Sequence, residues 1–145
     1  MTLDMMIGLL NLDLKNEWMH LKFYLVTASR LTGLHAHEYK EFFLDAAKSE
    51  MAHVQAFQDL IVGLGGEPTI ESNHFQLFND PVQALKYALH MEQKVVSNYV
   101  SRQDDAKKLA ETDKVNGTWI DVFLDSQIQD SREDADHLKQ ILKGL

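Results

Sequence analysis

The sequence contains no cysteine and only two prolines and seven glycines among its 145 residues. Without cysteine, a disulfide framework, a zinc–cysteine site, an iron–sulfur cluster and a cysteine nucleophile are all excluded. Few prolines and glycines leave room for few turns, so the secondary-structure elements must be long. Hydrophobic residues make up 45% of the chain and charged residues 25%, which is typical of a globular protein and predicts a single domain, residues 1–145.

Clustered positive charge and long apolar segments are also missing. The formal net charge is −8, which argues against nucleic acid as a partner because phosphate binding needs clustered lysine and arginine. No apolar run approaches the roughly 18–20 residues of a membrane span. A secretory signal would require positive charge near the N-terminus, but no lysine or arginine precedes Lys15. We therefore expect a soluble, cytoplasmic protein that has no membrane partner.

Apolar residues recur at alternating steps of three and four in four segments, which is typical of amphipathic helices. The pattern predicts helices at about 4–31, 37–64, 81–110 and 118–142. Thr32-Gly33, Gly65-Gly66 and Asn116-Gly117 are predicted to separate or end helices, and Asp80-Pro81 to begin the third. Two short links and one long link, at 65–80, predict an all-α four-helix bundle in which a long crossover joins two antiparallel hairpins.

Each predicted inner face contains acidic residues where a core normally has leucine. They are Glu17, Glu50, Glu92 and Asp134. Glu50 is followed three residues later by His53, and Asp134 by His137, so both members of each pair project from one helix face. The predicted inner face of the fourth helix comprises Trp119, Phe123, Gln127, Asp130, Asp134, His137 and Ile141. Antiparallel folding brings the acidic residues to similar depths, since they lie at similar distances from the turns.

Carboxylates that converge in an apolar bundle repel one another, and each is costly to desolvate while it stays ionised. Two divalent cations remove both costs, and carboxylate-rich sites with some imidazole suit iron or manganese. A single Glu-x-x-His motif on a helix is usually solvated. Two such acid–histidine pairs, with single glutamates on the other two helices, match the ligand pattern of di-iron bundles. The predicted metal ligands are Glu17, Glu50, His53, Glu92, Asp134 and His137.

Two of these motifs resemble the ferritin superfamily, and bacterioferritin most closely. "EMAHVQAFQDLIVGLGGEP" at 50–68 is similar to the second-helix signature of bacterioferritin, and "REDADHL" at 132–138 to its fourth-helix Arg-Asp-Glu-x-x-His motif. The resemblance spans nearly the whole chain and implies a ferritin-like bundle with a di-iron centre. In that centre Glu17 and His53 would ligate one iron, Glu92 and His137 the other, while Glu50 and Asp134 would bridge them.

The resemblance also implies oxidation of Fe(II) by oxygen or peroxide, for iron storage or detoxification, in a homo-oligomer of two or more chains. Tyr24 lies where the family has a tyrosine near the metals, so it either donates a hydrogen bond or an electron there or only packs. Met51 lies where bacterioferritin has its haem ligand, so it either binds haem b as a further cofactor or only packs against a partner chain. Another di-metal carboxylate oxidase, oxygenase or peroxidase on the same bundle stays open as an alternative function.

Three features depart from the family pattern. Asp134 replaces a glutamate and is one methylene shorter, so bridging requires a shift of the backbone or the metal, or becomes monodentate. His20 adds a third Glu-x-x-His pair with Glu17, and we expect it at the surface rather than as an additional ligand. The sequence ends at "KQILKGL" with no clear fifth helix, which cage-forming ferritins usually have, so we do not expect a large storage cage.

Overall fold

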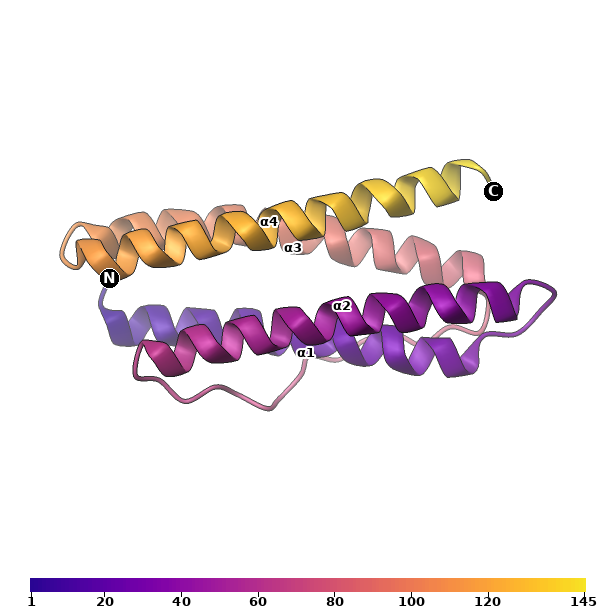
Figure 1. Cartoon of the computed structure of the whole chain (residues 1–145), viewed down its shortest axis with the longest axis horizontal. Coiled ribbons are helices and arrows are strands. Elements are labelled where there is room, and N and C mark those ends of the chain that lie inside the picture. The colour runs from indigo at the N-terminus through magenta and orange to yellow at the C-terminus, as the bar shows by residue number, and fades with distance from the viewer. The chain divides into compact units, whose positions relative to one another are not determined.

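The computed structural model describes all 145 residues and contains four helices and no strand (Figure 1). The helices are α1 (Leu3–Arg30), α2 (Ala36–Gly63), α3 (Pro81–Ala110) and α4 (Lys114–Lys143). The predicted all-α class is therefore confirmed, and the first three predicted helices agree with the observed bounds to within one residue. None of the helices has an apolar stretch long enough to cross a membrane.

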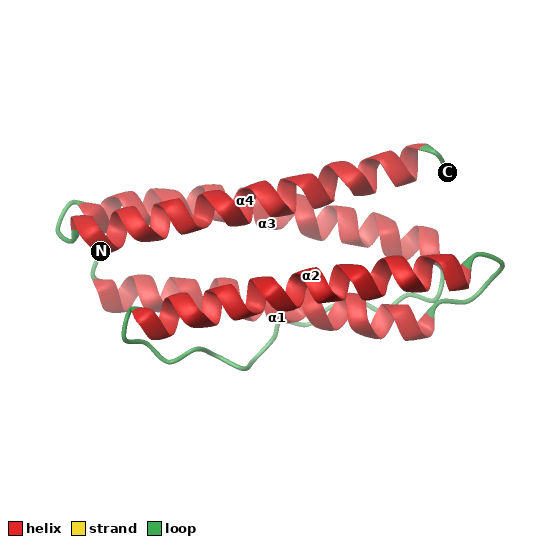
Figure 2. Ribbon diagram, viewed as in Figure 1, coloured by secondary structure: helices red, strands yellow, loops and turns green.

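Residues Leu10–Tyr87 form one compact unit, which contains most of α1, all of α2 and the long crossover. Within it α1 and α2 run antiparallel, side by side, joined by a short link (Figure 2). Aromatic rings fill the contact between them near the link. The ring of Phe23 lies 5.3 Å from that of Tyr24 and 6.2 Å from that of Phe43. All three side chains are at most 2% exposed, so this end of the hairpin is a packed core.

The crossover between α2 and α3 follows α1. The Asn11 side chain donates to the Glu67 carbonyl and accepts from the Thr69 N–H, at 3.0 and 2.9 Å. Further along α1, the indole of Trp18 donates to the Thr69 carbonyl at 2.9 Å. At the end of α1, the Thr32 N–H donates to the Asn79 carbonyl, also at 2.9 Å. The crossover is neither helix nor strand, so its backbone groups lack the regular hydrogen bonds of those elements. These bonds provide partners for some of them.

Residues Met1–Leu9 and Ala88–Leu145 form the second compact unit, in which α3 and α4 are the main elements. The predicted break between these helices at Asn116-Gly117 is wrong, because α4 already begins at Lys114. The carboxylate of Asp113 accepts a hydrogen bond from the Asn116 N–H at 3.3 Å and so caps the first turn. This cap satisfies a free N–H of the helix start, which lets the helix begin four residues earlier than predicted and run through Gly117.

Gly117 has a packing role inside α4. A Cβ atom at this position would lie 2.5 Å from the backbone nitrogen of Ala110 and 2.6 Å from its Cα. Such distances are well inside van der Waals contact, so any side chain here would force the end of α3 away from α4. The glycine is therefore required by the close approach of two helices and not by a turn.

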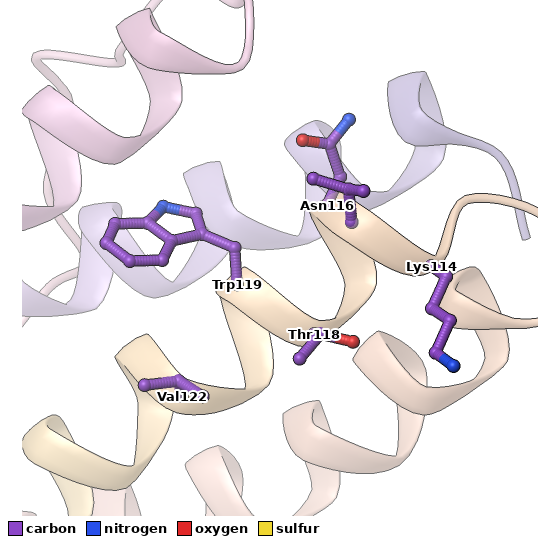
Figure 3. A pocket seen from close by; sticks show the side chains of 6 residues that line it. Lys114, Asn116, Thr118, Trp119 and Val122 are labelled. Atoms are coloured by element: carbon purple, nitrogen blue, oxygen red, sulfur yellow. The ribbon is translucent and has the colours of Figure 1, made fainter.

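The buried face of α4 also differs from the prediction. Trp119, expected on the inner face, is 60% exposed, and His137 and Asp130 are exposed as well. The buried positions of α4 are Gly117, Ile120, Leu124, Gln127, Ser131, Ala135 and Leu138. Trp119 and Val122 line a surface hollow of about 530 Å³. Figure 3 shows Trp119 projecting from the first turns of α4. Only Gln127 of the predicted face is fully buried, so the helix is rotated relative to the prediction.

Candidate metal centre

Three of the predicted ligands meet inside the α1–α2 hairpin. Glu17 lies on α1, and Glu50 and His53 lie one turn apart on α2, so that the helical repeat places both on the face toward α1. The Nδ1 atom of His53 is 3.1 Å from Glu50 Oε2 and 3.6 Å from Glu17 Oε2. None of the three residues is more than 4% exposed. The structure thus brings together all the predicted ligands that belong to this hairpin.

The electrostatics of the three residues favour a positive charge at this position. Burial raises the pKa of Glu17, and the neighbouring carboxylate of Glu50 raises it further. Burial alone would lower the pKa of His53, but its contacts with Glu17 and Glu50 outweigh this effect and raise that pKa to about 12. In the absence of any other cation, a proton on His53 compensates the two carboxylates. A divalent metal ion would displace that proton, because only a deprotonated imidazole nitrogen can bind metal.

His20 is a fourth donor, and its predicted place at the surface is wrong. It was expected at the surface, but its side chain is 1% exposed and lies one turn after Glu17 on the same face of α1. Its Nδ1 atom is 3.9 Å from Glu50 Oε1. Donor atoms of Glu17, His20 and Glu50 all lie within 4.8 Å of one another. The Glu-x-x-His spacing shared with Glu50 and His53 was the sequence signal for this position.

Glu92 and Asp134 belong to the second unit, on α3 and α4. Glu92 is fully buried and Asp134 half-buried, and carboxylate oxygens of the two lie within 4.8 Å of each other. The structure therefore pairs these two predicted ligands. His137, one turn after Asp134, is exposed, because the rotation of α4 moves it away from the buried face. Gln127 is buried on α4, and its Oε1 atom has no hydrogen-bond partner.

The two remaining predicted residues differ in their surroundings. Tyr24 is 2% exposed, and its ring lies 5.9 Å from that of Phe43 within the aromatic core of the hairpin. It lies one turn after His20 on the same face of α1, so it is both a packing residue and a neighbour of the donors. Met51, predicted as a haem ligand, is 59% exposed on α2, between the buried residues Glu50 and His53.

Comparison with known proteins agrees with the fold and the acidic interior. Residues 7–145 match the ferritin-like domain family, and the chain belongs to this family. A solved ferritin-like diiron-carboxylate protein from Bacillus anthracis is 26% identical, with a TM-score of 0.83 over 97% of this chain and 96% of that one. No match was found among curated proteins.

Two bacterioferritins have the same fold. That of Rhodobacter capsulatus is 17% identical, with a TM-score of 0.83 over 97% of this chain and 84% of that one. BfrA from Mycobacterium tuberculosis is 19% identical, with a TM-score of 0.84 over 95% of this chain and 83% of that one. The predicted ferritin-like bundle, with a resemblance to bacterioferritin, is thus confirmed.

The donor set suits iron. Around one ion, metal–donor distances of about 2.0–2.2 Å place neighbouring donor atoms about 3–4 Å apart. The distances of 3.1, 3.6 and 3.9 Å between imidazole and carboxylate atoms of the hairpin are close to this spacing. Anionic oxygen donors combined with imidazole are the ligands that Fe(II), Fe(III) and Mn(II) share in proteins. The residues present therefore fit the metal that a diiron-carboxylate fold implies.

Proposed function

We propose that the protein is a ferroxidase, which binds Fe(II) as substrate at a di-iron centre and oxidises it with oxygen or peroxide. The observation that carries this proposal is the convergence of Glu17, Glu50 and His53 in the interior of the α1–α2 hairpin. Two buried carboxylates without a cation are unfavourable, and Glu17 and Glu50 are both buried beside the same nitrogen of His53. Membership in the ferritin-like family, and similarity to a diiron-carboxylate protein, support iron as that cation.

The second metal position is assigned to Glu92, Asp134 and His137. Glu92 and Asp134 lie close to each other, which supports a shared role. Asp134 would bridge the two ions together with Glu50, although its side chain is one methylene shorter than the glutamate of the family. His137 would bind after a rotation of its side chain from its exposed position. Tyr24, next to the donors on α1, would donate a hydrogen bond or an electron.

The chemistry follows from the ligands. Carboxylates are hard, anionic donors that stabilise Fe(III) relative to Fe(II), so binding here favours the loss of an electron. Two Fe(II) ions would together deliver two electrons to one oxidant molecule and become two Fe(III) ions. With two protons from solvent, oxygen would be reduced to hydrogen peroxide, and hydrogen peroxide to two molecules of water. The oxidised iron is then stored or released, which gives the protein a role in iron storage or detoxification. Mn(II) binds the same donor types, so metal analysis after purification from iron-containing medium decides between the two.

Aerobic addition of Fe(II) to the purified protein tests the activity. The near-ultraviolet absorbance of ferric-oxo species should grow much faster with the wild type than with Glu50→Ala, which lacks the carboxylate shared by the donors. Glu41→Ala is the matched control, because Glu41 is an exposed carboxylate on the same helix. It should oxidise Fe(II) like the wild type. Equal rates for the wild type and Glu50→Ala, with both proteins folded by circular dichroism, would reject the proposal.

The alternative, a di-metal oxidase or oxygenase with an organic substrate, requires an apolar pocket beside the metals. In the hairpin, that space holds Tyr24, Phe43 and Phe57, which are at most 2% exposed. This packing favours iron itself as the substrate. Bound metal without Fe(II) oxidation, in the same assay, would favour the alternative.

Assembly into a homo-oligomer is part of the proposal. Several large apolar side chains of α1 and α2 are 40–59% exposed, and their burial between chains would contribute favourably. They are Leu12, Leu25, Val26, Met51 and Val62. Light scattering during size-exclusion chromatography should give the mass of a dimer or a larger assembly, and a mass near 16.6 kDa would contradict this part.

A further inference from the structure

The α1–α2 hairpin holds more donors than its share of a two-metal centre requires. Besides Glu17, Glu50 and His53, it places the imidazole of His20 in the interior, with Nδ1 3.9 Å from Glu50 Oε1. A histidine on a helix surface would instead turn its ring to solvent, as exposed His37 on α2 does. Burying an imidazole costs free energy unless a partner compensates that cost. The groups beside the imidazole of His20 are the carboxylates of Glu17 and Glu50.

We infer that Glu17, His20, Glu50 and His53 form a complete four-donor site for one divalent transition-metal ion. All four residues belong to the compact unit of residues 10–87, so no other part of the chain is needed to complete it. Two carboxylates balance the charge of one dication, which removes the cost of burying either charge alone. The inference rests on the proposed function for the identity of the ion, and adds that this position fills first.

The Nδ1 atoms are the ligating atoms of both histidines. His53 Nδ1 lies against Glu17 and Glu50, and His20 Nδ1 faces Glu50. The three donor atoms of Glu17, His20 and Glu50 are no more than 4.8 Å apart. Rotations of long glutamate side chains are sufficient to close this distance to the roughly 3–4 Å between donors around one ion.

The other nitrogen of His20 lies against Asn16 on α1, and Asn73 of the crossover contacts Asn16 in turn. A ligating imidazole normally donates the N–H of its second nitrogen to a fixed acceptor, which sets the orientation of the ring. His20 Nε2 lies 3.4 Å from the side-chain amide nitrogen of Asn16, and Asn73 donates to the oxygen of that amide, also at 3.4 Å. A half-turn of both amides exchanges oxygen and nitrogen without a change of shape, so that Asn16 accepts from Nε2–H. Asn16 is thus a positioning residue for His20.

Titration of the metal-free full-length protein with Co(II) tests the inference, since Co(II) gives visible ligand-field bands that report its donors. The first equivalent should bind to the wild type and to His37→Gln with the same affinity and spectrum. His20→Gln should bind the first equivalent at least tenfold more weakly, with altered bands. Wild-type affinity and bands in His20→Gln, or a wild-type protein that binds no Co(II), would overturn the inference.

A second measurement needs no variant. The wild-type complex with one equivalent of Co(II) should show paramagnetically shifted, exchangeable imidazole N–H resonances from two histidines. A single shifted N–H resonance would overturn the inference, even if His20→Gln fails to fold.

The two proposals fail separately. Loss of Co(II) affinity in His20→Gln without Fe(II) oxidation by the wild type rejects only the ferroxidase. Fe(II) oxidation with unchanged Co(II) binding in His20→Gln rejects only the role of His20.

Discussion

Substitution of Gly117 by alanine tests how closely α3 and α4 are packed. The new methyl carbon would lie 2.5 Å from the backbone nitrogen, 2.6 Å from Cα and 2.7 Å from Cβ of Ala110. Ordinary carbon contacts are about 3.5–4.0 Å, so the overlap is roughly 1 Å. Because two of the three atoms belong to the backbone, no rotation of a side chain relieves it, and the end of α3 must move.

The magnitude follows from two opposing effects. Overpacking costs about 1–3 kcal/mol, and an overlap with backbone atoms that no side chain can relieve belongs in the upper part of that range, about 2–3 kcal/mol. Alanine favours a helix over glycine by about 1 kcal/mol, which offsets part of that cost. The net loss is about 1–2 kcal/mol in the free energy of unfolding, which lowers the Tm of a chain of this length by about 3–6 °C.

Thermal unfolding followed by far-ultraviolet circular dichroism measures the change, on metal-free protein so that metal binding does not contribute. Gly8→Ala is the matched control, because Gly8 lies exposed within α1 and an added Cβ meets nothing within 4 Å. It should gain about 1 kcal/mol and raise the Tm. If Gly117→Ala unfolds at or above the wild-type temperature, the packing argument is refuted.

Three further changes follow from the structure. In metal-free protein, a pKa of about 12 keeps the His53 ring protonated at pH 8, as ¹⁵N NMR of the ring should show, and proton loss near the ordinary 6.5 would contradict it. The stability that this raised pKa contributes is full below pH 6.5 and is lost as the pH rises toward 12, by at most about 1.4 kcal/mol per pH unit. Protein supplied with haem should develop a Soret band that Met51→Leu lacks, and identical spectra would exclude Met51 as the ligand. Trp18→Phe loses the hydrogen bond to Thr69 and should cost about 1 kcal/mol in thermal unfolding, whereas an unchanged Tm would show that this bond contributes nothing.

Several features of the fold could be predicted because they depend on local patterns. Helix lengths follow from the repeat of apolar residues. The end of α2 follows from Gly65, and the start of α3 follows from Asp80. Gly65 has a φ of +88°, which glycine adopts without strain, and Asp80 accepts from the Gln83 N–H at 2.9 Å. The convergence of Glu17 and Glu50 could also be predicted, since antiparallel helices bring residues equidistant from a turn to the same depth.

What the local pattern could not decide was the rotation of each helix and the contacts between distant segments. A shift of the buried face by one residue rotates a helix by about 100°, and in α4 both Trp119 and Ile120 could begin an apolar stripe. Packing buries Ile120 and exposes Trp119 and His137. The sequence predicted a turn at Gly117, because the contact of Gly117 with Ala110 exists only once α3 and α4 have packed.

His20 shows the same division between sequence and tertiary structure. Its spacing from Glu17 was visible in the sequence, but a single Glu-x-x-His motif on a helix is usually solvated, so the spacing alone does not decide burial. Only the neighbouring α2, which brings Glu50 within 3.9 Å, and the crossover, which brings Asn73 to Asn16, decide that His20 is buried. The sequence by itself determined four amphipathic helices and an acidic interior. The tertiary structure decided which side chains share that interior, because burial depends on contacts between residues far apart in the chain.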